Sequence, residues 1–392
     1  MNQSGPAERV GKIMMDFGRL TGLEPVGASP KRYLWTDAFA VCNYLELSRT
    51  TGDSAYREMA TRLIDQVHHT LGRYREDDSR TGWISGLPEQ EGAVHPTLGG
   101  LRIGKPLRER GPTEPYDERR EWDQDGQYYH YLTKWMHALH QAGRVTNDVK
   151  YLTWAIELAQ TVHDGFTYLP RSGGRKRMFW KMSTDLTRPL VPSMGQHDPL
   201  DGFVTYQELQ HAALQDFRLA SRPGLNAAIA DMADICQGMR LSTDDPLGIG
   251  GLLSDAVRVA QLTIQRGSAF GDLLESILDS GLKGVDYIKK GGSLGLPAAC
   301  RLPFRELGLS IGLSGAELLQ EWIGENPALF GRPDILQRQV GSLMGLRVVR
   351  SSIEQFWMRD TNRQADTWTG HQEINMVMLA TSLAPRGFLL IS

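Results

Sequence analysis

RTTGDSAY, residues 49–56, is the most informative stretch of this chain, because the same pattern returns 95 residues later as RVTNDVKY, residues 144–151. The match continues through Ala60, Leu63, Val67 and His68, which correspond to Ala155, Leu158, Val162 and His163. Residues 38–47, AFAVCNYLEL, are apolar on nearly every side, whereas the segment after Tyr56 carries apolar residues at spacings of three and four with charges between them. Each copy therefore predicts a buried inner helix, a short turn and a one-sided outer helix.

An inner helix followed by an outer helix is a unit that repeats around a ring. Asp53 and Asp148 stand where N-caps of the two outer helices belong. No segment has the alternating pattern of a strand. We therefore expect an all-α fold, an (α/α)6 toroid of six helical hairpins in one domain over residues 1–392, with an open solenoid as the alternative. Further helices are predicted at 6–20, 202–220, 224–240, 251–266, 269–289, 302–324, 333–357 and 370–384.

The composition excludes several classes of protein. Hydrophobic residues make up 41% of the chain and charged residues 23%, as in ordinary globular proteins. The net charge of −3 gives no basic excess for a nucleic-acid partner. Cys42, Cys236 and Cys300 are too far apart for a zinc motif and lie among apolar residues. Because no membrane-spanning run or signal peptide is evident, we expect a cytoplasmic protein without a membrane partner.

Three segments resemble a known superfamily. RYLWTDAFAVCNYLELSRTTGD (32–53), TKWMHALHQAGRVTNDVKYLTWAIELA (133–159) and HQEINMVMLATSL (371–383) look like the inner and outer helices of the six-hairpin glycosidase-like proteins. They are also similar to the N-acylglucosamine 2-epimerase family. Both resemblances imply the (α/α)6 toroid and chemistry on a small carbohydrate substrate. One departure stands out, because the His-x-x-Glu-Trp run associated with those epimerases is missing.

Two connections, at about 73–125 and 168–201, are much longer than a helical hairpin needs, and long loops in a compact domain are usually functional. We expect them to cover the mouth of the central funnel. WDQDGQYYHY, residues 122–131, ends the first connection and supplies aromatic faces and planar polar groups, the two kinds of group that bind sugars. Asp125 alone would serve equally well as a helix cap. The candidate site residues of this region are Glu121, Trp122, Asp123, Asp125, Gln127, Tyr128 and His130, with Arg102 and Lys105 as cations for a substrate carboxylate or phosphate.

The second connection and two helix starts add further candidates. Gly195 and Pro199 fix a turn that carries three consecutive polar side chains, although such groups also bond to backbone. Cofactor motifs are missing, because the glycine-rich segments lack a preceding strand and a phosphate-binding lysine, so we expect neither a cofactor nor a metal. The additional substrate-binding or catalytic candidates are Trp35 and Asp37, then Trp180, Gln196, His197 and Asp198, then Trp368 and His371.

Three functions compete on these residues. A glycoside hydrolase needs one carboxylic acid and one carboxylate, for which Asp125 and Asp198 are the preferred pair and Asp123 a further candidate. A cofactor-independent epimerase or isomerase would instead move a proton with histidines, for which His197 and His371 are the natural pair. A sugar-binding toroid without catalysis is the third. Hydrolysis of an oligosaccharide or glycoside is placed first. The oligomeric state, the sugar and the linkage stay open.

Overall fold

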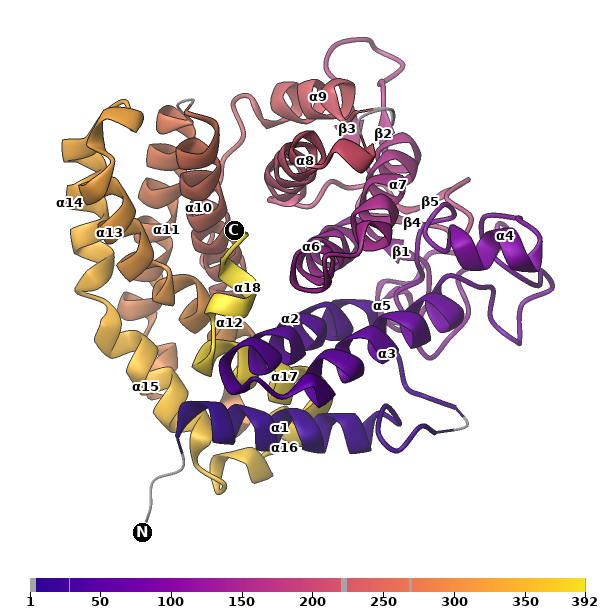
Figure 1. Ribbon diagram of the computed structural model, residues 1–392, viewed down its shortest axis with the longest axis horizontal. Coiled ribbons are helices and arrows are strands. Elements are labelled where there is room, and N and C mark those ends of the chain that lie inside the picture. The colour runs from indigo at the N-terminus through magenta and orange to yellow at the C-terminus, as the bar shows by residue number, and fades with distance from the viewer. Residues whose placement is uncertain (1–4, 28, 220–223, 268–269, 392) are drawn as a thin grey trace. The chain divides into compact units, whose positions relative to one another are not determined.

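The computed structural model describes residues 5–27, 29–219, 224–267 and 270–391. Within these ranges the regular structure is almost entirely helical, with five strands of two or three residues each. It divides into two compact units (Figure 1). The first unit comprises residues 21–48 and 52–239, and the second comprises residues 1–20, 49–51 and 240–392.

The first unit is built from three successive pairs of long helices. Helix α6 packs against α7 and α8, and α8 packs in turn against α9. The inner helix α2 is buried over its whole length from Leu34 to Leu47, whereas the outer helix α3 buries a single stripe. The pairs are α2 (Leu34–Thr51) with α3 (Ser54–Leu71), α6 (Tyr129–Thr146) with α7 (Val149–Phe166), and α8 (Asp198–Gln215) with α9 (Asn226–Cys236).

The sequence repeat reflects two identical helix connections. Gly52 and Asn147 end their inner helices in the left-handed conformation, with φ of 74° and 53°, which glycine and asparagine tolerate better than other residues. The next residue caps the outer helix: Asp53 accepts a hydrogen bond from the Ala55 N–H at 2.9 Å, and Asp148 accepts one from the Lys150 N–H at 3.0 Å. The expected N-caps are thus confirmed.

The two long connections of the first unit fold against each other just before α6 and α8. β1, at the start of α6, pairs antiparallel with β4, which pairs with β5; β2 pairs with β3. The connections carry α4 (Glu89–Val94), α5 (Glu118–Asp123), β1 (Gln127–Tyr128), β2 (Thr167–Tyr168), β3 (Arg177–Met178), β4 (Lys181–Met182) and β5 (Pro189–Val191).

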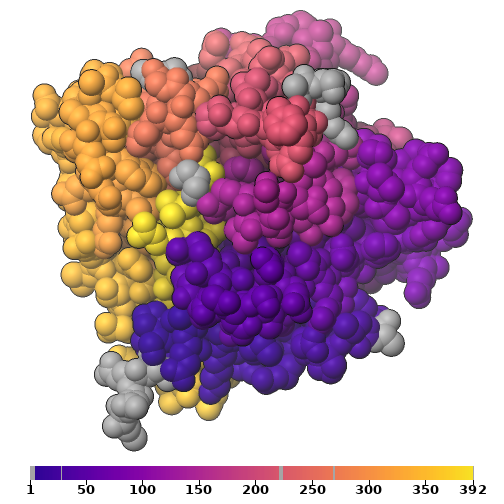
Figure 2. All heavy atoms as spheres, in the orientation of Figure 1, coloured from indigo at the N-terminus to yellow at the C-terminus, as the bar shows by residue number. Residues whose placement is uncertain are grey.

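The second unit has the same pairing of buried and amphipathic helices. α10 (Pro246–Arg266) packs against α11 (Gly271–Gly291) and α12 (Pro303–Ser314). α17 (Gln372–Leu383) packs against α12 and against α1 (Pro6–Leu20). Its remaining helices are α13 (Ala316–Glu325) and α14 (Pro333–Met344), which lie at the surface in light orange in Figure 2, then α15 (Arg347–Met358), α16 (Asp366–Thr369) and α18 (Arg386–Leu389).

α10 is the one helix of the described residues that is long and apolar enough to cross a membrane, with a mean hydropathy of 1.2 over its best window. Of that window 78% is buried inside the protein. Packing against α11 and α12 accounts for its apolar composition, as in the core helix of a soluble protein.

Several predicted helix boundaries were wrong. The segments 302–324 and 333–357 are each two helices, broken at Gly315 and Gly345. A Cβ on Gly315 would lie 2.3 Å from Val257 Cγ2, so the break can lie this close to α10 only because the residue is glycine. The predicted helix 202–220 begins earlier, at Asp198, with Pro199 in its first turn, and ends at Gln215. The predicted ends at 220 and 269 fall outside the described residues.

Candidate functional site

Six aromatic side chains gather at the N-terminal ends of α2 and α6 in the first unit. The Tyr33 and Tyr131 hydroxyls are 2.7 Å apart, and Tyr131 also contacts the ring of Trp35, with 6.4 Å between centroids. Tyr128 lies 5.1 Å from Trp180, centroid to centroid. We call this cluster the aromatic wall; it consists of Tyr33, Trp35, Tyr128, His130, Tyr131 and Trp180.

Local structure explains why these rings meet. Tyr128 pairs with Lys181 where β1 meets β4, which places the residue before Lys181, Trp180, beside the start of α6. Tyr33 is the extended residue before α2, and its N–H donates to the Asp37 carboxylate at 2.9 Å. Burial raises the pKa of the Tyr33 and Tyr128 phenols, so both hydroxyls remain protonated at neutral pH and are able to donate a hydrogen bond.

Asp198, the first residue of α8, provides a carboxylate beside the wall. Its Oδ1 lies 3.8 Å from His130 Nδ1, and the His130 ring is parallel to Trp180 at 6.2 Å. Among the described residues, neither Asp198 Oδ2 nor His130 Nδ1 has a hydrogen-bond partner, although both atoms are buried. Buried polar atoms are normally satisfied, and exceptions call for an explanation such as a bound ligand or water.

One turn further along α8, Asp201 holds the start of α6 in place. Its Oδ1 accepts a hydrogen bond from Lys134 Nζ at 2.7 Å, and its Oδ2 accepts one from the Thr133 hydroxyl. The carboxylate is therefore committed to two partners on α6. Because the two helices are joined at this point, Asp198 and the wall keep a fixed separation.

Two further side chains, Lys105 and Trp122, contact the wall, and Asp123 follows Trp122 in the chain. Lys105 Nζ lies 5.5 Å from the centre of the Tyr33 ring, and Trp122 contacts Trp180 with 5.6 Å between centroids. Trp122 is 49% exposed, and the neighbouring Asp123 is also exposed. Asp123 exerts a long-range attraction on the Lys105 ammonium. Lys105 thus borders the wall at Tyr33, and Trp122 borders it at Trp180.

The predicted catalytic role of Asp125 needs correction, because its side chain is completely buried. One oxygen accepts a hydrogen bond from Arg102 at 2.5 Å, and the other accepts one from the Gly104 N–H at 3.0 Å. Arg102 also donates to the carbonyl oxygens of Thr70 and Arg73. Both side chains are buried and bonded to protein groups, so the pair fixes the first connection instead.

Two neighbours of Asp125 are corrected for the same reason. Glu121 is 3% exposed and forms ion pairs with Arg110 and Lys181, both at 2.9 Å. The Gln127 amide accepts the Leu101 N–H and donates to the carbonyl oxygens of Gly99 and Thr184. Most of the polar groups that suggest sugar recognition in the sequence therefore bond to other parts of the protein and hold the first connection in place.

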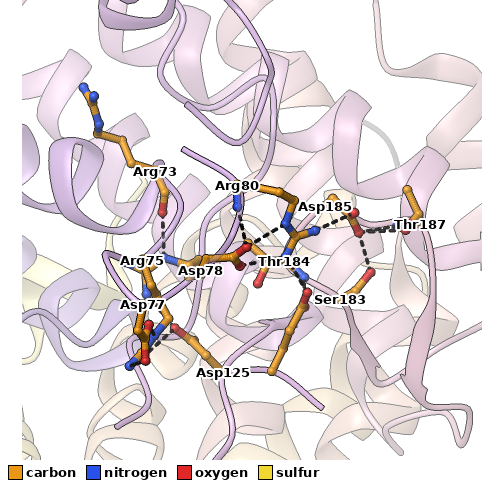
Figure 3. A network of polar contacts seen from close by, with 12 residues as sticks. Arg73, Arg75, Asp77, Asp78, Arg80, Asp125, Ser183, Thr184, Asp185 and Thr187 are labelled. Carbon is orange, nitrogen blue, oxygen red and sulfur yellow. Dashed lines mark hydrogen bonds and ion pairs between the residues drawn. The ribbon is translucent and has the colours of Figure 1, made fainter. Parts of the chain in front are cut away.

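Polar contacts between the two long connections form a continuous network around these anchors (Figure 3). Arg80 is its centre, because one guanidinium bonds Asp78 and Glu109 in the first connection and Asp185 in the second. The Glu109 carboxylate also accepts the Thr184 N–H. Arg75 joins the network to Asp125, with 3.7 Å between the charged atoms.

The other candidates of the first unit fall into two groups. Asp37 is 1% exposed and paired with Arg32 at 3.5 Å; burial raises the pKa of its carboxyl to about 6, against the opposing effects of Arg32 and the Tyr33 N–H. Its predicted contact with substrate is therefore wrong. Gln196 is exposed, and His197 is the half-buried residue before α8, whose carbonyl accepts the Asp201 N–H. Both lie next to Asp198 in the chain.

Two predicted site residues, Trp368 and His371, belong to the second unit. Trp368 is only 4% exposed and stacks on Trp357 at 5.8 Å, so its predicted role in substrate binding is corrected to a role in packing. His371 is exposed and precedes α17, with its ring 5.9 Å from Phe304.

Two other features that often mark a functional site, a cluster of metal ligands and a large cavity, do not point to the aromatic wall. Among the described residues, no group of three or more His, Cys, Asp or Glu side chains is arranged to hold a metal ion. A cavity of about 520 Å³ lies at the other end of α6 and α8, lined by Arg144, Asn147, Asp216 and Arg218 among others. Asp216 and Arg218 neutralise each other there at 2.6 Å, which gives the cavity no distinct charge.

Sequence reasoning did not single out Tyr33, Tyr131 or the contact between Lys134 and Asp201. Tyr33 lies two residues before Trp35, and Tyr131 is the last residue of the candidate stretch 122–131. The signal that would have found both is their place at the starts of two inner helices. Lys134 lies one turn after His130, so helical spacing alone puts both on one face.

Comparisons with known proteins concern the fold. Neither the scan against protein-family models nor the search of curated proteins finds a match. Among solved structures, the chain is similar to the GH76A alpha-1,6-mannanase from Salegentibacter sp. HEL1_6, with a TM-score of 0.50, 12% identity, and coverage of 97% of this chain and 99% of that one. A cellobiose 2-epimerase from Spirochaeta thermophila DSM 6192 is matched at a TM-score of 0.45, with 13% identity and coverage of 87% and 85%. The fold class expected from the sequence, an all-α (α/α)6 toroid, is therefore confirmed.

Proposed function

We propose that this chain is a carbohydrate-active enzyme and that its reaction is the hydrolysis of a glycosidic bond. The observation that carries the proposal is the aromatic wall with the Asp198 carboxylate beside His130; exposed Asp123 follows Trp122, whose ring contacts Trp180. Aromatic faces cover the C–H faces of a sugar, and the Tyr33 and Tyr131 hydroxyls bond to its hydroxyl groups. The likeness of the fold to an alpha-1,6-mannanase supports the same substrate class.

In this mechanism Asp198 is the general acid and protonates the leaving oxygen. Its buried Oδ2 has no hydrogen-bond partner among the described residues, which leaves it available to a ligand. Asp123, which is exposed, takes the role of the base that activates water. An inverting hydrolase requires about 6.5–9.5 Å between two such carboxyl groups, which leaves room for the water.

The test is the release of reducing ends from an oligosaccharide panel that begins with alpha-1,6-linked mannose oligomers. Asp198→Asn and Asp123→Asn each remove a titratable group at nearly constant shape, so each should lower kcat by about 10²–10⁴-fold. Asp286→Asn, on the exposed face of α11, is the matched control and should retain wild-type activity. Wild-type rates in both site variants would overturn the mechanism.

A second candidate, a sugar epimerase, is favoured by one specific observation: the proximity of His130 to Asp198. A carboxylate beside an imidazole orients the ring and supports proton transfer. Epimerisation in deuterated water would introduce solvent deuterium into the sugar without releasing a reducing end. His130→Gln would abolish that exchange, whereas the hydrolase proposed first would incorporate no carbon-bound deuterium with any variant.

A further inference from the structure

Most of the cations around the aromatic wall have acidic partners. A cation with a close carboxylate partner contributes to the structure and has little attraction left for a ligand. The committed cations are Arg102 with Asp125, Lys181 with Glu121, Lys134 with Asp201, and Arg110 with Glu121.

Lys105 differs from all of these. Across the part of the chain that the structure describes, its Nζ forms no ion pair or hydrogen bond, and its close contact is with the Tyr33 ring at 5.5 Å. The side chain is nevertheless half-buried. Burial, followed by the nearby Lys181 charge, lowers the pKa of Lys105. A half-buried ammonium without a close anion is an unfavourable arrangement that a bound anion would relieve.

The backbone holds Lys105 in position. Its N–H donates to the Asp125 carboxylate at 3.3 Å, and its carbonyl oxygen accepts a hydrogen bond from Arg75 at 2.6 Å. The buried Asp125 anchor therefore serves to place the Lys105 ammonium at the edge of the wall. Asp123 attracts it only from beyond ion-pair distance, which leaves the three ammonium protons available.

We propose that Lys105 binds a carboxylate of the substrate, and that the preferred substrates are acidic glycosides containing a uronic acid. This inference rests on the proposed function, because it assigns the sugar that the wall receives. The ammonium lies over the Tyr33 ring, 5.5 Å from its centre, so a sugar unit bound beside this ring can pair its carboxylate with Lys105. A carboxylate fits better than a phosphate, because phosphate recognition commonly uses an Arg fork and the neighbouring Arg75 and Arg102 are already committed.

The experiment compares binding of three ligands that differ at one carbon: a methyl hexoside, the corresponding hexuronide and the hexoside 6-phosphate. Calorimetry at neutral pH is done on the wild-type chain, Lys105→Met and Lys105→Arg. Wild type should bind the hexuronide about 10- to 100-fold more tightly than the neutral hexoside, since hydrogen bonds to charged groups have that effect. Lys105→Met should remove most of this preference, and Lys105→Arg should keep much of it.

Lys289→Met is the matched control, because Lys289 is an exposed lysine on α11 of the second unit, and it should keep the wild-type preference. Equal affinity for neutral and acidic sugars, or a preference that survives Lys105→Met, would overturn the inference and leave the proposed function standing. Preferential binding of the phosphate would overturn the carboxylate assignment. If no sugar binds in any arm, both the inference and the proposed function fail.

Discussion

Polar side chains between residues 121 and 130 have two different roles in the structure. Asp125, Glu121 and Gln127 are buried and bonded to distant protein groups, whereas Asp123 is exposed and His130 belongs to the aromatic wall. An acidic residue becomes an anchor when it is buried beside arginine, because an unpaired buried charge is costly. Exposure therefore separates anchoring groups from candidate reacting groups in this segment.

Asp125→Asn should lower stability, while leaving the activity of the folded protein within about tenfold of wild type. The substitution leaves the buried Arg102 without its anionic partner, and breaking a buried pair costs about 3–5 kcal/mol. Urea denaturation measures the free energy of unfolding, and activity is assayed well below the transition. Asp77→Asn, an exposed partner of Arg75, is the control and should cost at most about 1 kcal/mol. A stable but inactive Asp125→Asn would restore the catalytic role expected from the sequence.

Whole helices are joined to one another by specific contacts between buried groups. His68 on α3 accepts a hydrogen bond from the Trp135 indole of α6 at 3.1 Å and contacts the Trp154 ring of α7. Gly250 of α10 lies so close to α12 that a Cβ there would be 2.1 Å from the Gly308 carbonyl oxygen. Such contacts determine which helix faces can pack.

The pH dependence of stability should reveal the His68 contact. Burial lowers the pKa of His68 to about 3, whereas the unfolded chain binds a proton near pH 6.5. Between these two pH values only the unfolded state gains the proton. The contribution of neutral His68 to the free energy of unfolding is therefore fully present above about pH 6.5 and is lost as the pH falls toward 3. The loss relative to His68→Gln should reach about 3 kcal/mol near pH 4, measured by urea denaturation across the pH range. Glutamine keeps an acceptor for the indole but does not titrate. His69→Gln, at the exposed neighbouring position, should follow wild type.

Two adjacent glycines of α10 should respond in opposite directions to alanine. Gly250→Ala forces α10 and α12 apart and should cost about 1–3 kcal/mol or more, since overpacking strains the core. At Gly251 no atom lies within 4 Å of the added Cβ, so alanine should stabilise the helix by about 0.5–1 kcal/mol. Thermal and urea unfolding of both variants check this. Equal effects at the two positions would contradict the close approach of the helices.

At the scale of the whole molecule, ion pairs hold the two long connections together, although they lie about a hundred residues apart in the sequence. Arg80 pairs with Asp185 at 2.7 Å and with Glu109 at 2.6 Å, which ties the segment before α6 to the segment before α8. Both segments carry residues of the candidate site. Substrate recognition should therefore depend on contacts far from any substrate.

Arg80→Met should loosen both connections without unfolding the helices. Because the guanidinium is partly exposed, the loss is on the order of 1 kcal/mol, which corresponds to about fivefold faster local amide exchange in residues 105–115 and 181–191. Hydrogen exchange followed by mass spectrometry gives the measurement. Arg108→Met removes a more exposed cation that, among the described residues, pairs only with Glu114 of the same connection, and exchange in 181–191 should not change. Similar exchange in both variants would mean that Arg80 does not join the connections.

The helical repeat could be predicted from local sequence alone, because the left-handed residues Gly52 and Asn147 and the caps Asp53 and Asp148 act over a few residues. Burial patterns of the inner and outer helices are equally local, since they follow from helical periodicity. Trp122, Trp180 and Asp198 could be proposed from the sequence, because the long connections are rich in aromatic residues and Gly195 and Pro199 mark a turn that carries Asp198.

Which polar groups remain available to a ligand depends instead on the folded chain. The partners of Asp125, Glu121 and Gln127 lie 23, 60 and 57 residues away in the chain at Arg102, Lys181 and Thr184, so no local pattern reveals that they are committed. The approach of Asp198 to His130 and the isolation of Lys105 depend equally on distant segments. A charge becomes an anchor or a binding group according to which partners folding brings within a few ångströms, and that distance is a property of packing.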